Sequence, residues 1–344
     1  MEKILYLTHT QQDDTLSKAA REALNAAVDL SKGLAGSTLT VGLVGEDVQA
    51  AANAIAGCGA AAFFGVAGAE FAVSRYGSDA AAAEALAKAA GATLILAPAT
   101  SRLSRALPGV AQRLQGRIDT HVTGILTEGG NLHIQRWYYR QRMMATLTRS
   151  HRPWLLLVDP AVFDPWQGQP GSVSVQAVAA SLPEGGTRTH VVGVEGASTD
   201  AQTIRPDAKL LFVAGAGWTK KQADGQTHVK EAEALILGFL EKTQASLGSS
   251  KSLVDQSSEG QEVISFLSHL NQVGQTGATP RHPKGLATCC HGEEPHVVGW
   301  RFINERRAVN TDPNCGWARG KADVLYVADA FKVIAKVNEL LAEG

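Results

Sequence analysis

The residues best suited to chemistry are concentrated in Asn271-Gln-Val-Gly-Gln-Thr-Gly277 and in the segment that follows it. Two glycines and several small polar side chains within seven residues predict a turn whose backbone N–H groups and hydroxyl can lie against a ligand. A cysteine pair, several histidines and a basic run follow, as far as Asn310-Thr-Asp-Pro313. No other part of the sequence gathers so many groups of this kind, so we expect a ligand site here.

A second candidate is the segment Leu210-Leu-Phe-Val-Ala-Gly-Ala-Gly217, which reads as a strand running into a Gly-x-Gly turn. An amphipathic helix is predicted from Glu231 to Leu247, with Gly248 ending it. Strand, glycine turn and helix are the parts of a nucleotide site. The match to Gly-x-Gly-x-x-Gly is incomplete because Lys220 stands in place of the third glycine, so an ordinary strand-to-helix turn is the alternative.

Two other groups of residues invite functional readings that their spacing does not favour. Cys289-Cys290 with His291, Cys315 and Cys58 include no Cys-x-x-Cys pair, and adjacent cysteines do not easily share one tetrahedral zinc. We therefore expect no metal site. The run Arg136-Trp-Tyr-Tyr-Arg-Gln-Arg142 is better explained as a strand with alternating faces, available for a subunit interface, than as a nucleic-acid surface.

The composition is that of a globular protein. A chain of 344 residues favours two domains. A formal net charge of -1 gives no reason to expect nucleic acid or an anionic membrane as partner. The N-terminus lacks the apolar segment of a signal peptide, there is no 18-residue apolar run, and four cysteines do not suggest a disulfide framework. We therefore expect a cytoplasmic protein with reduced thiols.

The elements that must position these groups follow an alternating pattern in the first part of the chain. Short apolar runs predict four strands, at Ile4–Leu7, Leu39–Val44, Ala62–Val66 and Thr93–Ala97. Segments with helical spacing lie between or after them: Thr15–Lys32, Ala50–Ala56, Ser78–Ala90 and Ser101–Leu114. Strands that alternate with helices predict a parallel sheet covered on both faces.

From Val122 onward the pattern changes. Four runs without intervening helices are interpreted as strands added to the first domain as an antiparallel edge: Val122–Leu126, His133–Tyr139, Met143–Arg149 and Trp154–Val158. Residues 164–207 are loop-like, with strand-like pieces at Val173–Val178 and Thr189–Val194, and the domain boundary is placed near their end. The predicted domains are therefore 1–204 and 205–344, the second closing with a strand at Val324–Val327 and a helix at Ala330–Leu341.

These residues together resemble the alpha subunit of an electron transfer flavoprotein, over nearly the whole chain. Gln272-Val-Gly-Gln-Thr-Gly277 matches the family's flavin motif in full, and His296, Asn310-Thr-Asp-Pro313 and Val327-Ala-Asp-Ala-Phe331 follow in the family's order. In the first domain, Ala97-Pro-Ala-Thr-Ser-Arg-Leu-Ser-Arg-Ala-Leu-Pro-Gly109 is similar to the family's glycine- and serine-rich turn and helix. The motif at 272–277, followed by the other motifs in the same order as in the family, is more specific evidence for the resemblance than any one motif alone.

The sequence also departs from the family pattern. The family's glycine turn carries an arginine where this chain has Ala216, and its Ser-Arg pair is replaced by Ser250-Lys251. A lysine keeps the charge but loses the planar guanidinium. The loop Thr288-Cys-Cys-His-Gly-Glu-Glu-Pro-His296 is more polar and acidic than the family's, so the flavin's potential and partner are expected to differ.

The resemblance implies residue roles around FAD. Thr276 would lie near flavin N5 and His296 near the N1/C2=O edge, where an imidazole favours the anionic ring; the alternatives are a turn threonine and a surface histidine. Lys251 is a candidate second positive group, or a solvated lysine. The remaining expected cofactor-binding residues are Gln272, Val273, Gly274, Gln275, Gly277, Cys290, His291, Gly292 and Asp312.

Further roles are expected at the nucleotide end of the cofactor. Gly215, Gly217 and Ser250 are candidates for the pyrophosphate, because bare backbone N–H groups suit phosphate oxygens. Asn310 and Asp329 would serve the adenosine end, although an aspartate just before a helix is also an ordinary N-cap.

The expected fold class is α/β, with an N-terminal parallel-sheet domain carrying added antiparallel strands and a C-terminal doubly wound FAD-binding domain. The expected function is that of an electron carrier rather than a substrate-transforming enzyme. The resemblance implies a heterodimer with a beta subunit that binds AMP, a flavin dehydrogenase as donor and a membrane-associated quinone reductase as acceptor. The alternatives are a flavin-dependent oxidoreductase acting on a small substrate and a non-redox interaction subunit that has lost FAD.

Overall fold

The computed structural model divides the chain into two compact units, Met1–Val194 and Glu195–Gly344. It describes residues 1–138, 143–182, 189–193, 204–205, 208–255, 262–273, 282–289, 303–315 and 322–343. The predicted boundary between residues 204 and 205 stays a prediction.

The first unit is built on one nine-stranded sheet. Its strands are β1 (Lys3–His9), β2 (Thr38–Gly45), β3 (Ala62–Ala67), β4 (Leu94–Pro98), β5 (Arg117–Glu128), β6 (Asn131–Tyr138), β7 (Met143–Leu147), β8 (Trp154–Val158) and β9 (Val175–Ala177). Its helices are α1 (Lys18–Gly33), α2 (Gln49–Ala54), η1 (Ala56–Cys58), α3 (Ala69–Ala72), α4 (Tyr76–Ala89) and α5 (Ser101–Arg113).

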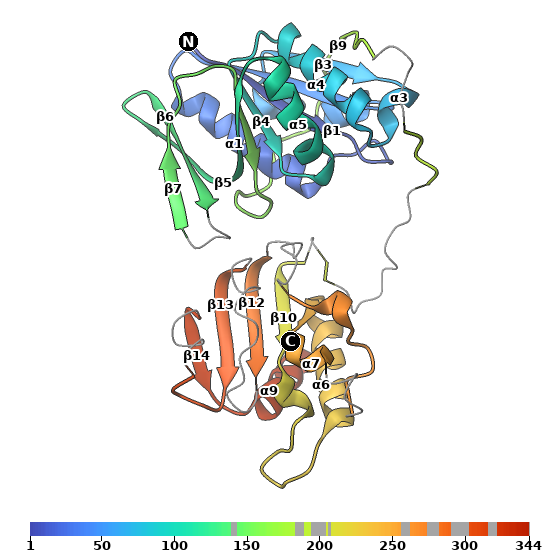
Figure 1. Cartoon of the computed structure of the whole chain (residues 1–344), viewed down its shortest axis with the longest axis vertical. Helices are drawn as coiled ribbons and strands as arrows, with labels where there is room; N and C mark the ends of the chain where they lie inside the picture. Colours follow the sequence, from blue (N-terminus) through green and yellow to red (C-terminus); the bar gives the residue numbers. More distant parts are fainter. Residues whose placement is uncertain are drawn as a thin grey trace. The chain divides into compact units, whose positions relative to one another are not determined.

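The strand order β7-β6-β5-β8-β4-β1-β2-β3-β9 gives a parallel sheet with an antiparallel extension at one edge. Only the pairs β5–β6 and β6–β7 are antiparallel among the described strands. Helices α1 and α2 pack on one face, and α3, α4 and α5 pack on the other (Figure 1). Covered on both faces, the central strands are almost wholly apolar, as in α/β proteins generally.

Local sequence explains where the main helices of this unit begin. The Ser17 hydroxyl accepts the Ala20 N–H at the start of α1, and the Thr100 hydroxyl accepts the Leu103 N–H at the start of α5. Alanines line the buried face of α1, which lets the helix approach the sheet closely enough for the Tyr6 hydroxyl to donate to the Ala20 carbonyl at 2.7 Å.

The second unit is built on a five-stranded sheet in the order β11-β10-β12-β13-β14, all parallel. Its strands are β10 (Leu210–Ala214), β11 (Ser246–Ser249), β12 (His282–Cys289), β13 (Ile303–Asn310) and β14 (Val324–Val327). Its described helices are η2 (Ala216–Thr219), α6 (Val229–Thr243), α7 (Lys251–Asp255), η4 (His269–Asn271) and α9 (Ala330–Glu343). Helices α6, α7 and α9 pack on one face of this sheet (Figure 1).

The predicted fold class is confirmed: the chain is mixed α/β, with a large, mostly parallel sheet carrying antiparallel strands and a second, parallel sheet. The details of the first sheet differ at both edges. Trp154–Val158, expected as an added edge strand, is β8, a parallel strand between β5 and β4. The strand-like piece at Val173–Val178 becomes β9, which pairs with β3 at the opposite edge.

In the second unit the helix predicted to reach Leu247 is too long. Helix α6 ends at Thr243 because Gln244 takes a left-handed conformation (φ 53°), and Ser246–Ser249 forms strand β11. Gly248 lies inside that strand, where an added Cβ would meet Val273 Cγ2 at 2.2 Å. Strands β12 and β13 were also missed, because their polar and basic residues hide the apolar alternation that predicts a strand.

Candidate functional site

Of the described residues predicted to bind a cofactor, several lie at the carboxyl edge of the second sheet. All five strands are parallel, so their carboxyl ends lie at one edge. Gly215 follows β10, Ser250 follows β11, Asn310 ends β13 and Asp329 follows β14. The first strand, β10, lies between β11 and β12, so the strand order reverses there. Such a reversal point is where open α/β sheets bind ligands.

The turn after β10 does not have the geometry of the dinucleotide fingerprint. Gly215 is extended (φ -94°, ψ 167°), its N–H donates to the Thr288 carbonyl at 2.8 Å, and neither Gly215 nor Gly217 has a positive φ. A short helical turn, η2, follows, and the long helix α6 begins only at Val229. The glycines are therefore not required by the backbone conformation, and a lack of side chains at this edge leaves room for a ligand.

Two adjacent serines lie at the end of β11, and the sequence singled out only the second of them, Ser250. The Ser250 N–H continues the ladder to the Ala214 carbonyl at 2.9 Å, and its Oγ accepts the Leu253 N–H at 3.3 Å, so this hydroxyl caps α7. The Ser249 hydroxyl is fully buried and has no hydrogen-bond partner among the described residues. Its only signal in the sequence is its place beside Ser250. Lys251 opens α7, with Nζ 3.8 Å from Asp255 Oδ2.

The first residues of the glycine-rich motif dock on β11. Gln272 forms a bridge to Ser249, and the Val273 N–H donates to the Ser249 carbonyl at 3.0 Å. Val273 is buried against the same strand. The remainder of the motif, Gly274, Gln275, Thr276 and Gly277, lies outside the described residues, and so do Cys290, His291, Gly292 and His296.

Asn310 is the second fully buried residue with an unpaired polar atom at this edge. Its Oδ1 accepts the Asp312 N–H at 2.9 Å, whereas its Nδ2 has no hydrogen-bond partner within the described part of the chain. Buried polar atoms in proteins are rarely left unpaired, and those that have no protein partner usually bind a ligand or water. A donor at Asn310 Nδ2 is thus free to serve a ligand at this edge.

The two predicted aspartates have clear structural uses. Asp312 Oδ1 accepts the Asn314 N–H at 2.8 Å and stabilises the turn after β13. Asp329 Oδ1 accepts the Phe331 N–H at 2.8 Å and caps the start of α9. The N-cap expected as the alternative for Asp329 is therefore present, and its second carboxylate oxygen leaves the ligand role compatible with it.

Trp218 and Thr288 are further residues at this edge that the sequence did not single out. Trp218 lies in η2 and is fully buried, and its Nε1 donates to Thr288 Oγ1 at 2.8 Å. Its only sequence signal is an indole directly after the glycine turn.

These features fit a cofactor with polar groups, and FAD is such a molecule. The turn at Gly215 and Gly217 gives bare backbone, while Ser249 Oγ and Asn310 Nδ2 give two buried groups available for hydrogen bonds. Thr276 and His296, which are predicted to lie against the flavin ring, are outside the described residues. The donor set of the described part therefore fits the nucleotide portion.

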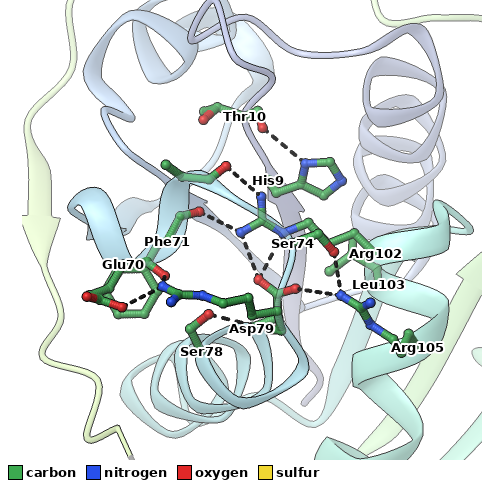
Figure 2. Close-up of polar contacts among 12 residues, drawn as sticks. His9, Thr10, Glu70, Phe71, Ser74, Ser78, Asp79, Arg102, Leu103 and Arg105 are labelled. Atoms are coloured by element: carbon green, nitrogen blue, oxygen red, sulfur yellow. Dashed lines mark hydrogen bonds and ion pairs between the residues drawn. The ribbon is translucent and has the colours of Figure 1, made fainter. Parts of the chain in front are cut away.

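A second polar cluster lies in the first unit, near the carboxyl ends of β1 and β4 (Figure 2). Arg102 of α5 donates to Asp79 of α4 (Nε to Oδ1, 2.9 Å) and to the Phe71 carbonyl of α3 (2.5 Å). Both charged side chains are buried. Because the guanidinium satisfies groups on both neighbouring helices, this cluster is a structural tie among α3, α4 and α5.

His9, at the end of β1, belongs to the same region. Its Nδ1 lies 3.1 Å from the Thr10 carbonyl, so Nδ1 carries the proton, and Nε2 accepts from Thr100 Oγ1 at 3.2 Å. Burial lowers the pKa of His9, and the charge of Arg102 lowers it further, although the Thr10 carbonyl opposes both. The imidazole is therefore neutral at pH 7.

The basic and aromatic run has a structural explanation in its described part. Arg136 Nη1 donates to the buried Asp119 Oδ1 at 2.8 Å, and its guanidinium lies 4.5 Å from the centre of the Tyr138 ring. Residues 139–142 of the run are outside the described residues. Within the described ranges, no three His, Cys, Asp or Glu residues are grouped to hold a metal ion.

Comparison with known proteins adds a family match that falls in the first unit. A family model described as "Electron transfer flavoprotein domain" matches residues 4–183, more than half of the 344 residues. Protein FixB of Clostridium saccharobutylicum is 26% identical over 240 residues, which are 69% of this chain and 64% of that protein. Electron transfer flavoprotein subunit alpha of Clostridium acetobutylicum is 27% identical over 242 residues, with the same two shares.

The alignments thus span less than two thirds of the length of these curated relatives. As for membranes, none of the described helices combines the length and the apolar character needed to cross one.

Proposed function

The chain belongs to the electron transfer flavoprotein family, and on that premise we propose that it is an FAD-binding alpha subunit that carries electrons. The observation that carries the proposal is the carboxyl edge of the second sheet. There two fully buried polar atoms, Ser249 Oγ and Asn310 Nδ2, lack hydrogen-bond partners among the described residues, beside a turn containing two glycines.

In this proposal bound FAD supplies a ring that takes up and releases electrons, and the protein does no covalent chemistry. Asn310 Nδ2 and Ser249 Oγ donate hydrogen bonds to the nucleotide portion. Gly215 and Gly217 let the backbone approach the pyrophosphate. Asp329 accepts from a ribose hydroxyl with the carboxylate oxygen that does not cap α9.

Around the ring, the proposed roles fall to residues of the two motifs. Thr276 donates a hydrogen bond near N5. His296 and Lys251 supply positive charge near the edge where negative charge accumulates on reduction. The other predicted contacts are Gln272, Val273, Gly274, Gln275, Gly277, Cys290, His291, Gly292 and Asp312.

The proposed partners follow from family membership. The first unit would pack on a beta subunit that binds AMP, a flavin dehydrogenase would deliver electrons in the cytoplasm, and a membrane-associated quinone reductase would accept them. The relative from Clostridium acetobutylicum is itself named as a subunit, which supports an assembly with a second chain. The proposed domains are 1–204 and 205–344, with reorientation of the second domain between partners.

The test is a spectrum and a reductive titration of the full chain co-expressed with a beta subunit. We expect flavin absorbance bands at about one FAD per chain, and a more negative potential in His296→Ala and Lys251→Ala because each removes positive charge. In a separate assay, a dehydrogenase substrate should reduce the flavin only when the donor dehydrogenase is added. Lys284→Ala is the matched control, since this exposed lysine lies at the start of β12, opposite Leu210.

Each contrary result has its own meaning. A complex without flavin bands would favour the non-redox subunit and end the carrier proposal. Oxidation of a small substrate without any dehydrogenase would favour a flavin-dependent oxidoreductase instead. Unchanged potentials in both variants would remove the roles given to His296 and Lys251 while leaving FAD binding intact.

A further inference from the structure

Trp218 contacts three segments at the carboxyl edge of the second sheet. It belongs to the turn after β10, its indole N–H reaches Thr288 near the end of β12, and its ring lies against Phe331 at the start of α9. The two ring centroids are 4.6 Å apart with an interplanar angle of 53°. The side chain is fully buried and uses its one polar group.

The hydrogen bonds around Thr288 have only one possible direction. An indole N–H can only donate, so Thr288 Oγ1 accepts from Trp218 Nε1 at 2.8 Å. The single hydroxyl proton is then left for the Val213 carbonyl, 3.0 Å away. The Thr288 carbonyl also accepts the Gly215 N–H at 2.8 Å. The main chain and side chain of Thr288 are therefore both held by β10 and its turn.

Both ends of this arrangement adjoin residues of the proposed cofactor site. Residue 288 is followed by Cys289, the last residue of β12, and in the sequence by Cys290 and His291, which are predicted to contact the cofactor. Phe331 lies two residues after Asp329, whose carboxylate accepts the Phe331 N–H. Replacing the Trp218 indole would therefore displace both the carboxyl end of β12 and the start of α9.

We propose that Trp218 is a positioning residue for the FAD site, which holds the carboxyl end of β12 against the glycine turn through Thr288. This inference rests on the proposed function. It differs from a purely structural role, because a buried tryptophan that only stabilised the core would change the unfolding temperature and leave FAD binding as it was.

The chain contains a matched control for the loss of an indole N–H. Trp154 is also fully buried, and its Nε1 donates to a buried carboxylate, Asp119 Oδ2, at 2.8 Å. It belongs to the first unit, in β8. Trp154→Phe therefore removes a buried indole hydrogen bond of the same length without touching the carboxyl edge of the second sheet.

The experiment measures the FAD dissociation constant, the visible circular dichroism of bound FAD and the unfolding temperature of the full chain. The variants are Trp218→Phe, Thr288→Val, their double variant and Trp154→Phe. We expect each of the first two to weaken FAD binding about fivefold, because the carboxyl end of β12 then occupies its binding-competent position only part of the time, and to change the circular dichroism. The double variant should lose less affinity than the sum of the two single effects, because both remove the bond between Trp218 and Thr288.

Trp154→Phe should lower the unfolding temperature but leave FAD binding within about twofold of the parent. The inference is overturned if Trp218→Phe binds FAD with the parent's affinity and spectrum, or if the two single effects add in the double variant. Failure of the unchanged chain to bind FAD would instead overturn the proposed function, so the two failures are distinguishable.

Discussion

At the scale of single residues, the proposed FAD site depends on two buried atoms, Ser249 Oγ and Asn310 Nδ2, for which the described residues offer no hydrogen-bond partner. Sequence patterns selected Asn310 but passed over Ser249 and chose Ser250, whose hydroxyl caps α7. A sequence shows which side chains can donate or accept, but not whether a neighbouring backbone group has already used them. For that reason the bond from the Asn314 N–H to Asp312 could not be foreseen, whereas the cap that Asp329 provides for α9 was expected as the alternative to its ligand role.

The role of Asn310 is tested by Asn310→Asp, which replaces the unpaired Nδ2 by a carboxylate oxygen. We expect FAD affinity to fall on the order of tenfold or more, because a donor is lost and a negative charge faces an anionic cofactor. Equilibrium dialysis with FAD measures it.

The control is Asn338→Asp, at a partly buried amide of α9 whose Nδ2 donates to the Leu235 carbonyl. It should lower stability without weakening FAD binding. Equal loss of affinity in the two variants would show that Asn310 acts only through the stability of the second unit.

At the scale of elements, the sequence predicted the strands and helices of the alternating region well, since apolar runs and helical spacing there are clear. It failed for β11, β12 and β13. Strand β11 was absorbed into the preceding helix because a left-handed Gln244 leaves no mark in the hydrophobic pattern. Strand β13, with Glu305, Arg306 and Arg307, carries charges in a strand position, which only tertiary packing makes favourable.

Docking of the glycine-rich motif on β11 gives a prediction about Gly248. An added Cβ at this residue meets Val273 Cγ2 at 2.2 Å, so Gly248→Ala should push Val273 away from the strand. We expect a loss of roughly 1–3 kcal/mol in the free energy of unfolding, as for overpacked cores, and weaker FAD binding. Gly193→Ala is the control, because a Cβ there has nothing within 4 Å. If Gly248→Ala and Gly193→Ala were equally stable, Val273 would not be packed against β11 as described.

The antiparallel extension of the first sheet depends on Asp119, and this dependence is sensitive to pH. Burial alone would raise the pKa of this carboxyl, but hydrogen bonds from Arg149, Trp154 and Arg136 hold it below its usual value. A lowered pKa means that the carboxylate stabilises the fold above the pKa of the unfolded chain, near 4, and that this stability is lost as the pH falls through the lower folded pKa.

Asp119→Asn should therefore lower the free energy of unfolding by roughly 2–4 kcal/mol at pH 7, with a difference from the parent that shrinks below about pH 4. Denaturant titrations between pH 3 and pH 7 measure this. A difference that stays constant, or grows in acid, would show that the charge of Asp119 is not what holds β5, β6 and β8 together.

At the scale of the whole molecule, the chain combines a first unit that carries the family match with a second unit that carries the proposed cofactor site. Arg205 is attached to the second unit: its carbonyl accepts from Ser246 Oγ at 3.1 Å and lies 2.9 Å from His282 Nε2. Both partners begin strands of the second sheet, so Arg205 is attached at the edge opposite to the proposed site. The fold class followed from the sequence; the position of the site followed only once the strand order was known.

The central claim is that FAD binds at the carboxyl edge of the second sheet, and amide hydrogen exchange of the full chain with and without FAD tests it most directly. We predict slower exchange in the turns at 215–219, 250–255 and 311–315, and no change at the opposite edge, in 204–205 and 282–284. Slower exchange confined to the first unit, at 9–12 and 99–105, or no change anywhere at saturating FAD, would contradict the claim.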